Sequence, residues 1–289
     1  MSSSFSDATQ SLLDRLRGRD RAHVGEAGRT KLLLHGEVRP RAIVLFHGLS
    51  ASPTQFVRFA HELHDQGHNV IVPRLPRHGH HDRLSEALAR LTAEELRVFA
   101  NDSVTLAQGL GERVIVAGFS IGGLLATWIA ERYPVERVVA IAPFFGISWV
   151  PSSWMGALSR MFLALPNRFE WWDPIAREKQ MPAHGYPRYS THALAQAYML
   201  AHEVIQRAPQ GVAAKRLTFV TNAHETAVSN RTVRRLETAL GAKDPTRLEH
   251  VVLTGIPFSH DIIEPLRHPE IANAVYPQLL GLISDPLGL

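Results

Sequence analysis

Ser120 stands at the centre of Gly118-Phe119-Ser120-Ile121-Gly122, a Gly-x-Ser-x-Gly pattern. The β-branched run 114–117 before it predicts a strand buried on both faces, and a helical pattern over 123–133 follows. A strand that runs into a helix through this pattern is typical of a nucleophile elbow, a turn so tight that glycines flank the serine. Such a turn exposes Oγ and directs the helix N-terminus at any anion that forms there. The alternative interpretation is a serine N-cap between two loop glycines, but the strand–turn–helix context favours a catalytic serine.

Length and composition allow one large core and exclude several classes of function. The chain has 289 residues with 45% hydrophobic content, enough for one domain with an inserted subdomain. Its 31 basic and 27 acidic residues are dispersed and leave a net charge of +4, so we expect no nucleic-acid partner. Cysteine is absent, which excludes disulfides and thiol catalysis. The polar N-terminus and the lack of a run of about 18 apolar residues predict a cytoplasmic protein without an integral membrane segment.

Strand-like apolar runs alternate with helical patterns along most of the chain. This alternation predicts an α/β fold, in which helices cover both faces of a mostly parallel sheet through right-handed crossovers. Capping-box spacing occurs at 52–55 (Ser-Pro-Thr-Gln) and at 92–95 (Thr-Ala-Glu-Glu). The predicted strands are 30–35, 42–46, 69–72, 114–117, 137–142, 217–220 and 250–253, and the predicted helices are 11–17, 53–66, 92–108, 123–133, 153–165, 192–207, 231–240 and one that begins near Pro269.

The composition changes between residues 146 and 212, where Trp, Met, Pro and Tyr become frequent. We therefore predict a core made of residues 1–145 and 213–289, interrupted by a helical cap over 146–212. An apolar roof over a cleft suits an acyl chain. Trp154 and Phe162 are our candidates for contacting the substrate; the alternative is that such aromatic side chains form the core of the cap itself.

One loop is rich in possible metal ligands: His78, His80, His81 and Asp82. These side chains are crowded together, and no second cluster at helical ligand spacing accompanies them. We therefore expect neither a metal nor a cofactor.

Taken together, these features resemble the α/β-hydrolase family, in particular its small cap-bearing carboxylesterases and monoacylglycerol-lipase-like enzymes. The resemblance covers about residues 30–285. It rests on His47-Gly48 at the end of the strand run 42–46, on the elbow around Ser120, on an acid after the next-to-last strand and on a late histidine. It implies an α/β-hydrolase fold with an inserted helical cap.

In this family the catalytic residues follow the chain order serine, acid, histidine, which Ser120, Glu225 and His260 satisfy. His260 lies just past the last strand, where its loop meets the elbow, and an imidazole there would take the proton of the serine hydroxyl. Glu225 lies five residues beyond the strand run 217–220, in a loop that a parallel sheet brings beside that of His260. A buried carboxylate would fix the imidazole tautomer and stabilise its cation.

Two other carboxylates are alternatives for the acid. Asp261 adjoins His260 in sequence and is poorly placed to reach back to Nδ1 of the same ring, and Asp244 lies beyond the helix at 231–240. Two departures from the family pattern also stand out. Residues 225–228 are Glu-Thr-Ala-Val where Asp-x-x-Val is usual, and residues 77–79 are Arg-His-Gly where Gly-His-Gly is usual.

The oxyanion of an acyl-transfer intermediate needs backbone donors. We expect them to be the N–H groups of Ile121, which follows the nucleophile, and of Leu49, which follows His47-Gly48. His47 is then a structural brace rather than a proton carrier; the alternative for His47-Gly48 is a plain strand-terminating turn.

The resemblance implies a serine hydrolase that cleaves small-molecule carboxylic esters through an acyl-enzyme. A thioesterase or an acyltransferase would use the same residues, and a non-catalytic hydrolase-fold protein that binds a ligand is a further alternative. The sequence leaves the acyl chain length open, and the oligomeric state is either monomer or homodimer.

Overall fold

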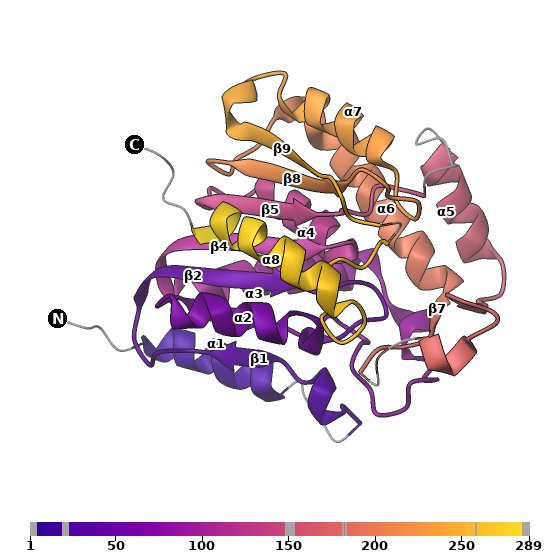
Figure 1. Ribbon diagram of the computed structural model, residues 1–289, viewed down its shortest axis with the longest axis horizontal. Helices are drawn as coiled ribbons and strands as arrows, with labels where there is room; N and C mark the ends of the chain where they lie inside the picture. The colour runs from indigo at the N-terminus through magenta and orange to yellow at the C-terminus, as the bar shows by residue number, and fades with distance from the viewer. Residues whose placement is uncertain are drawn as a thin grey trace.

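The computed structural model describes residues 5–18, 23–147, 154–180, 182, 184–257 and 259–284. In this part of the chain a seven-stranded sheet has the order β1-β3-β2-β4-β5-β8-β9 (Figure 1). Its β1 strand is antiparallel to β3, and the other pairs are parallel, so the mostly parallel sheet predicted from the sequence is confirmed. The strands are β1 (Lys31–Leu33), β2 (Arg39–Phe46), β3 (Asn69–Val72), β4 (Gly111–Phe119), β5 (Arg137–Ile141), β8 (Leu217–Asn222) and β9 (Leu248–Leu253).

Helices cover both faces of this sheet because its strands are apolar on both sides. Along β4, Ile115 and Ala117 pack in one buried cluster, whereas Val114 and Val116 pack in the other. The first cluster includes α2 and α8, which Figure 1 shows across the front of the sheet, and the second includes α1, α3, α4, α6 and α7. The helices are α1 (Asp7–Gly18), α2 (Val57–Asp65), α3 (Ala93–Gln108), α4 (Ile121–Ala130), α5 (Met155–Ala164), α6 (Thr191–Arg207), α7 (Asn230–Leu240) and α8 (Pro269–Ser284).

The turn between β4 and α4 depends on two glycines. A Cβ added to Gly118 would lie 2.1 Å from the carbonyl oxygen of Gly122. A Cβ on Gly122 would lie 2.1 Å from the carbonyl oxygen of Phe46, on the neighbouring strand β2. Real side chains do not approach backbone this closely, so the tight turn expected from the Gly-x-Ser-x-Gly pattern is present.

The two predicted capping boxes have different outcomes. At Thr92 both reciprocal hydrogen bonds with Glu95 form, and α3 begins there as predicted. At Ser52 the prediction is wrong, because the Ser52 hydroxyl makes no cap and instead donates to the carbonyl of Ala27. A 3₁₀ turn over Pro53–Phe56 precedes α2, and Gln55 directs its side chain away from the helix end.

The segment between β5 and β8 lies at the end of the sheet where the parallel strands finish (Figure 1). It contains α5, a two-stranded sheet of β6 (Phe169–Trp171) and β7 (Arg188–Ser190), and α6. Residues of α6 such as Tyr198 and Leu200 belong to the main core cluster, so this helix is continuous with the core. The boundaries of a cap at 146 and 212 stay a prediction; Trp149 and Met181, which contributed to its composition, lie outside the described residues.

None of the helices in the described ranges has the length and apolar character needed to cross a membrane.

Gly122→Ala should lower the free energy of unfolding by at least about 2 kcal/mol, because its methyl group would meet backbone that cannot move aside. Urea unfolding measures this change. Gly156→Ala is the matched control: it lies inside α5, and the nearest atom to an added Cβ is 3.5 Å away. We expect the free energy of unfolding of that control to rise by up to about 1 kcal/mol. Equal effects of the two substitutions would contradict the packing argument.

Candidate active site

Ser120 occupies a left-handed backbone conformation with φ of 55° and ψ of −114°. Its N–H donates to the carbonyl of Ile141 on β5 over 3.0 Å, and its own carbonyl accepts from the N–H of Phe144 over 3.0 Å. A non-glycine residue adopts such a conformation only where its surroundings enforce it. The neighbouring strand thus holds the serine at the carboxyl end of β4, where its side chain borders a cavity.

His260 bridges Ser120 and Glu225. Its Nε2 lies 3.0 Å from Ser120 Oγ, and its Nδ1 lies 2.8 Å from Glu225 Oε2. With Nδ1–H donating to the carboxylate, Nε2 is left to accept the hydroxyl proton. The amide of Asn222, the last residue of β8, donates to the carbonyls of Pro257 and Ser259 and so fixes the loop that carries His260. The structure therefore brings the three residues identified from chain order together at hydrogen-bonding distance.

Glu225 is held as a charged group. Its side chain is inaccessible to solvent, and Oε1 accepts hydrogen bonds from the N–H groups of Ala227 at 2.7 Å and Val228 at 3.3 Å. Burial by itself would raise the pKa of Glu225, but the hydrogen bond with His260, its positive charge when protonated and the two backbone donors outweigh burial and lower that pKa. The extra methylene of glutamate, compared with aspartate, is accommodated within this loop.

The two alternative carboxylates have other partners. Asp244 lies in an exposed turn, where it accepts from Thr246 and Arg247. Asp261 is buried, and its Oδ1 accepts from the backbone N–H of Ile263 and of Glu264. Burial, together with the charge of Glu264, raises the pKa of Asp261.

Two residues with backbone N–H groups that are unbonded in the described part of the chain line the same cavity. Within the described ranges, the N–H groups of Leu49 and Ile121 have no acceptor in the protein, and both residues line the cavity at Ser120. The carbonyl of Gly48 accepts from His47 Nδ1 over 2.9 Å. Because a trans peptide places C=O and N–H on opposite sides, this bond orients the N–H of Leu49 away from His47. Such free donors suit an oxyanion.

His47 and His78 are uncharged braces beneath this loop. His47 Nε2 accepts from the N–H of Leu75, and His78 Nε2 accepts from the N–H of Ser50. Burial lowers the pKa of His47 well below its ordinary value and lowers the pKa of His78 to about 4. Arg77, at the position where the family pattern has glycine, adopts a φ of 68°, and its guanidinium donates to Glu95.

A cavity of about 690 Å³ opens at Ser120 and His260. Its volume is typical of small-molecule sites. Leu49 and Ile121, with their backbone donors, line it together with Ser120 and His260. The rest of the wall is largely apolar and aromatic: Phe119, Phe144, Ile147, Trp172, Tyr189, Leu194, Ala197 and Val228.

Trp154 and Phe162, our candidates for substrate contact, are not among the described residues that line this cavity. Trp154 is 64% exposed and Phe162 is 37% exposed, both at helix α5. Trp172 and Tyr189, from the same segment, line it instead, and their rings pack against each other. The composition of this segment does not reveal the distinction, because it does not show which way a side chain points.

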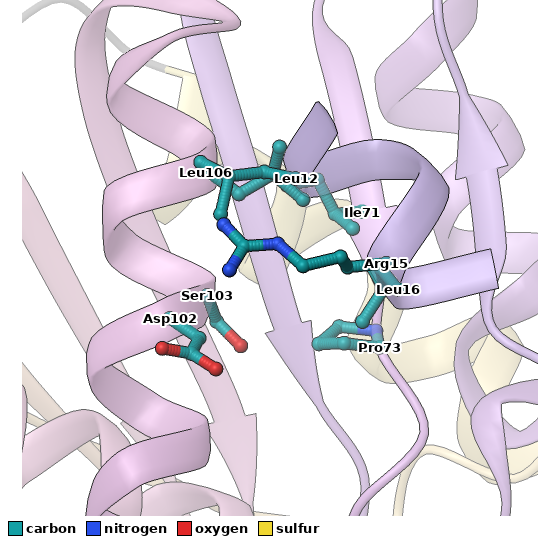
Figure 2. Close-up of a pocket in the computed structure, with 8 residues that line it drawn as sticks. All are labelled: Leu12, Arg15, Leu16, Ile71, Pro73, Asp102, Ser103 and Leu106. Carbon is teal, nitrogen blue, oxygen red and sulfur yellow. The ribbon is translucent and has the colours of Figure 1, made fainter. Parts of the chain in front are cut away.

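A second cavity, of about 40 Å³, lies between α1 and α3 (Figure 2). Arg15 of α1 reaches toward α3, which contributes Asp102, Ser103 and Leu106. This volume has room for only a few water molecules. It shares no lining residue with the larger cavity, so it is not a site for the same substrate.

No group of three or more histidine, aspartate or glutamate residues within the described ranges is arranged to hold a metal ion. In the histidine-rich loop, His78 serves as a brace, and His80 Nδ1 lies 3.1 Å from the hydroxyl of Ser85.

A family model described as the alpha/beta hydrolase family matches residues 43–267, which include Ser120, Glu225 and His260. The chain belongs to the alpha/beta hydrolase family. Over 102 residues this hydrolase is 29% identical to Lipase 1 of Psychrobacter immobilis, which covers 35% of this chain and 31% of that relative. Over 100 residues it is 27% identical to the thermostable monoacylglycerol lipase of Bacillus sp. (strain H-257), covering 35% of this chain and 39% of the relative. Each match thus spans well under half of the relative's length.

The fold of this hydrolase is also that of known lipases. The crystal structure of the Paleococcus ferrophilus monoacylglycerol lipase superposes with a TM-score of 0.62 and 21% sequence identity, covering 88% of this chain and 98% of that one. At this identity the likeness establishes the fold and leaves the substrate to be argued from the site.

The pKa of His78 predicts how the stability of this hydrolase varies with pH. That pKa is about 4 in the folded chain and about 6.5 in an unfolded one, so the unfolded state binds the proton more readily between these values. The stability contributed by neutral His78 is complete above about pH 6.5 and is lost as the pH falls toward about 4, a difference of about 3 kcal/mol.

His78→Gln keeps an acceptor for the Ser50 N–H but does not titrate. Urea unfolding at about pH 7 and at about pH 4 should show that this variant loses about 3 kcal/mol less than the wild type over that interval. The pKa of His47 is also lowered by burial, so part of the dependence of stability on pH remains in the variant. Identical pH dependence in the two proteins would show that His78 is not buried in its neutral form.

Proposed function

We propose that this hydrolase cleaves carboxylic esters through a covalent acyl-serine intermediate, with Ser120, His260 and Glu225 as its catalytic triad. The observation that carries the proposal is the chain of hydrogen bonds from Ser120 Oγ through His260 to Glu225, which opens on a largely apolar cavity. A solvent-inaccessible carboxylate held in its charged form, an imidazole bonded at both ring nitrogens and two free N–H donors are the elements that acyl transfer uses.

In the first half of the reaction, Ser120 Oγ attacks the ester carbonyl carbon as His260 Nε2 takes the hydroxyl proton. The carbonyl oxygen becomes an oxyanion that accepts from the N–H groups of Leu49 and Ile121. Glu225 stabilises the imidazolium. Collapse of the intermediate breaks the bond to the alcohol oxygen, which receives the proton from His260. In the second half, water attacks the acyl-serine with the same assistance, and the carboxylic acid leaves.

The cavity wall supports an ester with an apolar acyl group. Phe144, Trp172 and Tyr189 provide aromatic surface beside Ser120, and we assign contact with the acyl chain to them in place of Trp154 and Phe162. The partial similarity to Lipase 1 and to the thermostable monoacylglycerol lipase supports the same substrate class.

Ser120→Ala should abolish ester turnover and covalent labelling by a fluorophosphonate, because both require Oγ as the nucleophile. The wild type should take up one label per chain. A panel of p-nitrophenyl esters, monoacylglycerols and acyl-CoA thioesters of increasing chain length measures turnover and identifies the preferred leaving group. Circular dichroism of the variant checks that it is folded. Turnover or labelling that persists in the folded variant would refute the proposed nucleophile.

Glu225→Gln should keep the shape of the site and remove the charge that stabilises imidazolium. In a comparable triad, loss of this charge lowers kcat about 10⁴-fold. We expect a loss of that order with little change in KM, measured on the best ester of the panel. Asp244→Asn is the control, since that carboxylate lies in an exposed turn and should leave kcat unchanged. Should Glu225→Gln retain wild-type kcat, the acid is another residue.

A further inference from the structure

Gln55 connects the two loops that form the opposite sides of the reaction centre. Its Oε1 accepts from the N–H of Gly48 over 2.9 Å, and its Nε2 donates to Asp261 Oδ2 over 3.2 Å. Gly48 directly precedes Leu49, and Asp261 directly follows His260. Gln55 is 2% exposed and Asp261 is 8% exposed, and both border the cavity at Ser120.

The two hydrogen bonds of Gln55 form a bridge between Gly48 and Asp261, and each end of this bridge is fixed independently. Asp261 Oδ1 is held by the N–H groups of Ile263 and Glu264, so its other oxygen has one orientation available toward Gln55. On the other side, the carbonyl of Gly48 is held by His47. The peptides on both sides of Gly48 are therefore constrained, one by Gln55 and the next by His47, and the second of these peptides carries the N–H of Leu49.

The hydrogen bonds of Gln55 involve a carboxyl group in a buried site, which a packing role alone does not need. Burial and the neighbouring charge of Glu264 act against the charged form of Asp261. His184 Nε2 lies 2.8 Å from the carboxylate of Glu264. A pair of apolar side chains would fill the same space without a buried carboxylate, but it would not fix the distance between a backbone N–H and a loop through two directional hydrogen bonds.

We propose that Gln55 and Asp261 are positioning residues that fix the distance between the oxyanion donor, the N–H of Leu49, and the general base His260. The inference rests on the proposed ester hydrolysis at Ser120. The substrate carbonyl must meet the nucleophile, the general base and the oxyanion donors at once, and small misplacements of such groups cost large factors in rate. Gln55 sets the separation between the loop that supplies a donor and the loop that supplies the base.

Reversing the direction of the hydrogen bond tests this role. In Asp261→Asn, the side-chain oxygen stays with the N–H groups of Ile263 and Glu264, so the new NH₂ group meets the NH₂ group of Gln55. In Gln55→Glu, one carboxylate oxygen still accepts from Gly48, but the other meets the carboxylate of Asp261. The double variant has an amide that donates to a carboxylate, which restores the bridge with its polarity reversed.

We expect each single variant to lower kcat by about tenfold or more, with KM changed by less than about threefold. The reason is that the hydrogen bonds no longer fix the separation of the two loops. The double variant should recover kcat to within about threefold of the wild type. Active-site titration with a fluorophosphonate gives kcat per competent site, so that partial unfolding does not enter the comparison. A trifluoromethyl ketone forms an adduct with Ser120 that places an oxyanion at Leu49 and Ile121. Its inhibition constant should rise in each single variant and return toward the wild-type value in the double variant.

Gln196 supplies a matched control, since its Oε1 also accepts from a backbone N–H, that of Ala93, over 2.9 Å. Gln196→Glu should keep wild-type kcat and inhibitor affinity. A loss in this control equal to that of Gln55→Glu would overturn the inference, as would a double variant whose loss equals the product of the two single losses. Wild-type kcat per site and inhibitor affinity in both single variants would overturn it as well, while the Ser120→Ala result would still decide the proposed function separately.

Discussion

The conformation of Ser120 is the constraint on which the rest of the site depends. A positive φ at a non-glycine residue costs about 1–2 kcal/mol, so the surrounding sheet must favour this turn over its alternatives. Hydrogen bonds to Ile141 and Phe144 and the close approach of Gly122 to Phe46 do so. The consequence is a hydroxyl fixed at the carboxyl end of a central strand. The loops after β8 and β9 start from the same end of this sheet, and the hydrogen bonds of Asn222 fix the second loop beside the serine.

Buried titratable groups around this point differ in charge because their partners differ. Glu225 is held charged by a donating imidazole and two backbone N–H groups, although burial opposes that form. His47 and His78 have an N–H donor at one ring nitrogen and a carbonyl acceptor at the other, which satisfies the neutral ring. Burial lowers the pKa of each ring by more than its carbonyl acceptor raises it. The same low-dielectric environment therefore supports a charged acid on one side of the serine and uncharged braces on the other.

Periodicity and chain order were sufficient to predict most of the scaffold. Each predicted strand occurs within a few residues of its expected place. The prediction is simplest for the central parallel strands, which are buried on both faces and read as continuous apolar runs. Glu225 and His260 were found from their positions after strands, since the topology rather than local sequence brings them to Ser120. The side chain of Gln55 could not be placed from the sequence. Its spacing from Ser52 indicates a capping box, but the folded chain offers it Gly48 and Asp261, and tertiary partners override a local preference.

Ser50 links the segment over the cavity to the loop that presents Leu49. It is fully buried with a φ of 66°, and its N–H donates to His78. Its carbonyl accepts from the N–H of Tyr186 over 2.7 Å, and its hydroxyl accepts from the indole of Trp172 over 3.1 Å. Trp172 also lines the cavity, so a side chain on the apolar wall is bonded to the residue next to a free backbone donor. Ser50 therefore joins the apolar wall of the cavity to the loop of the backbone donor through hydrogen bonds of one buried residue.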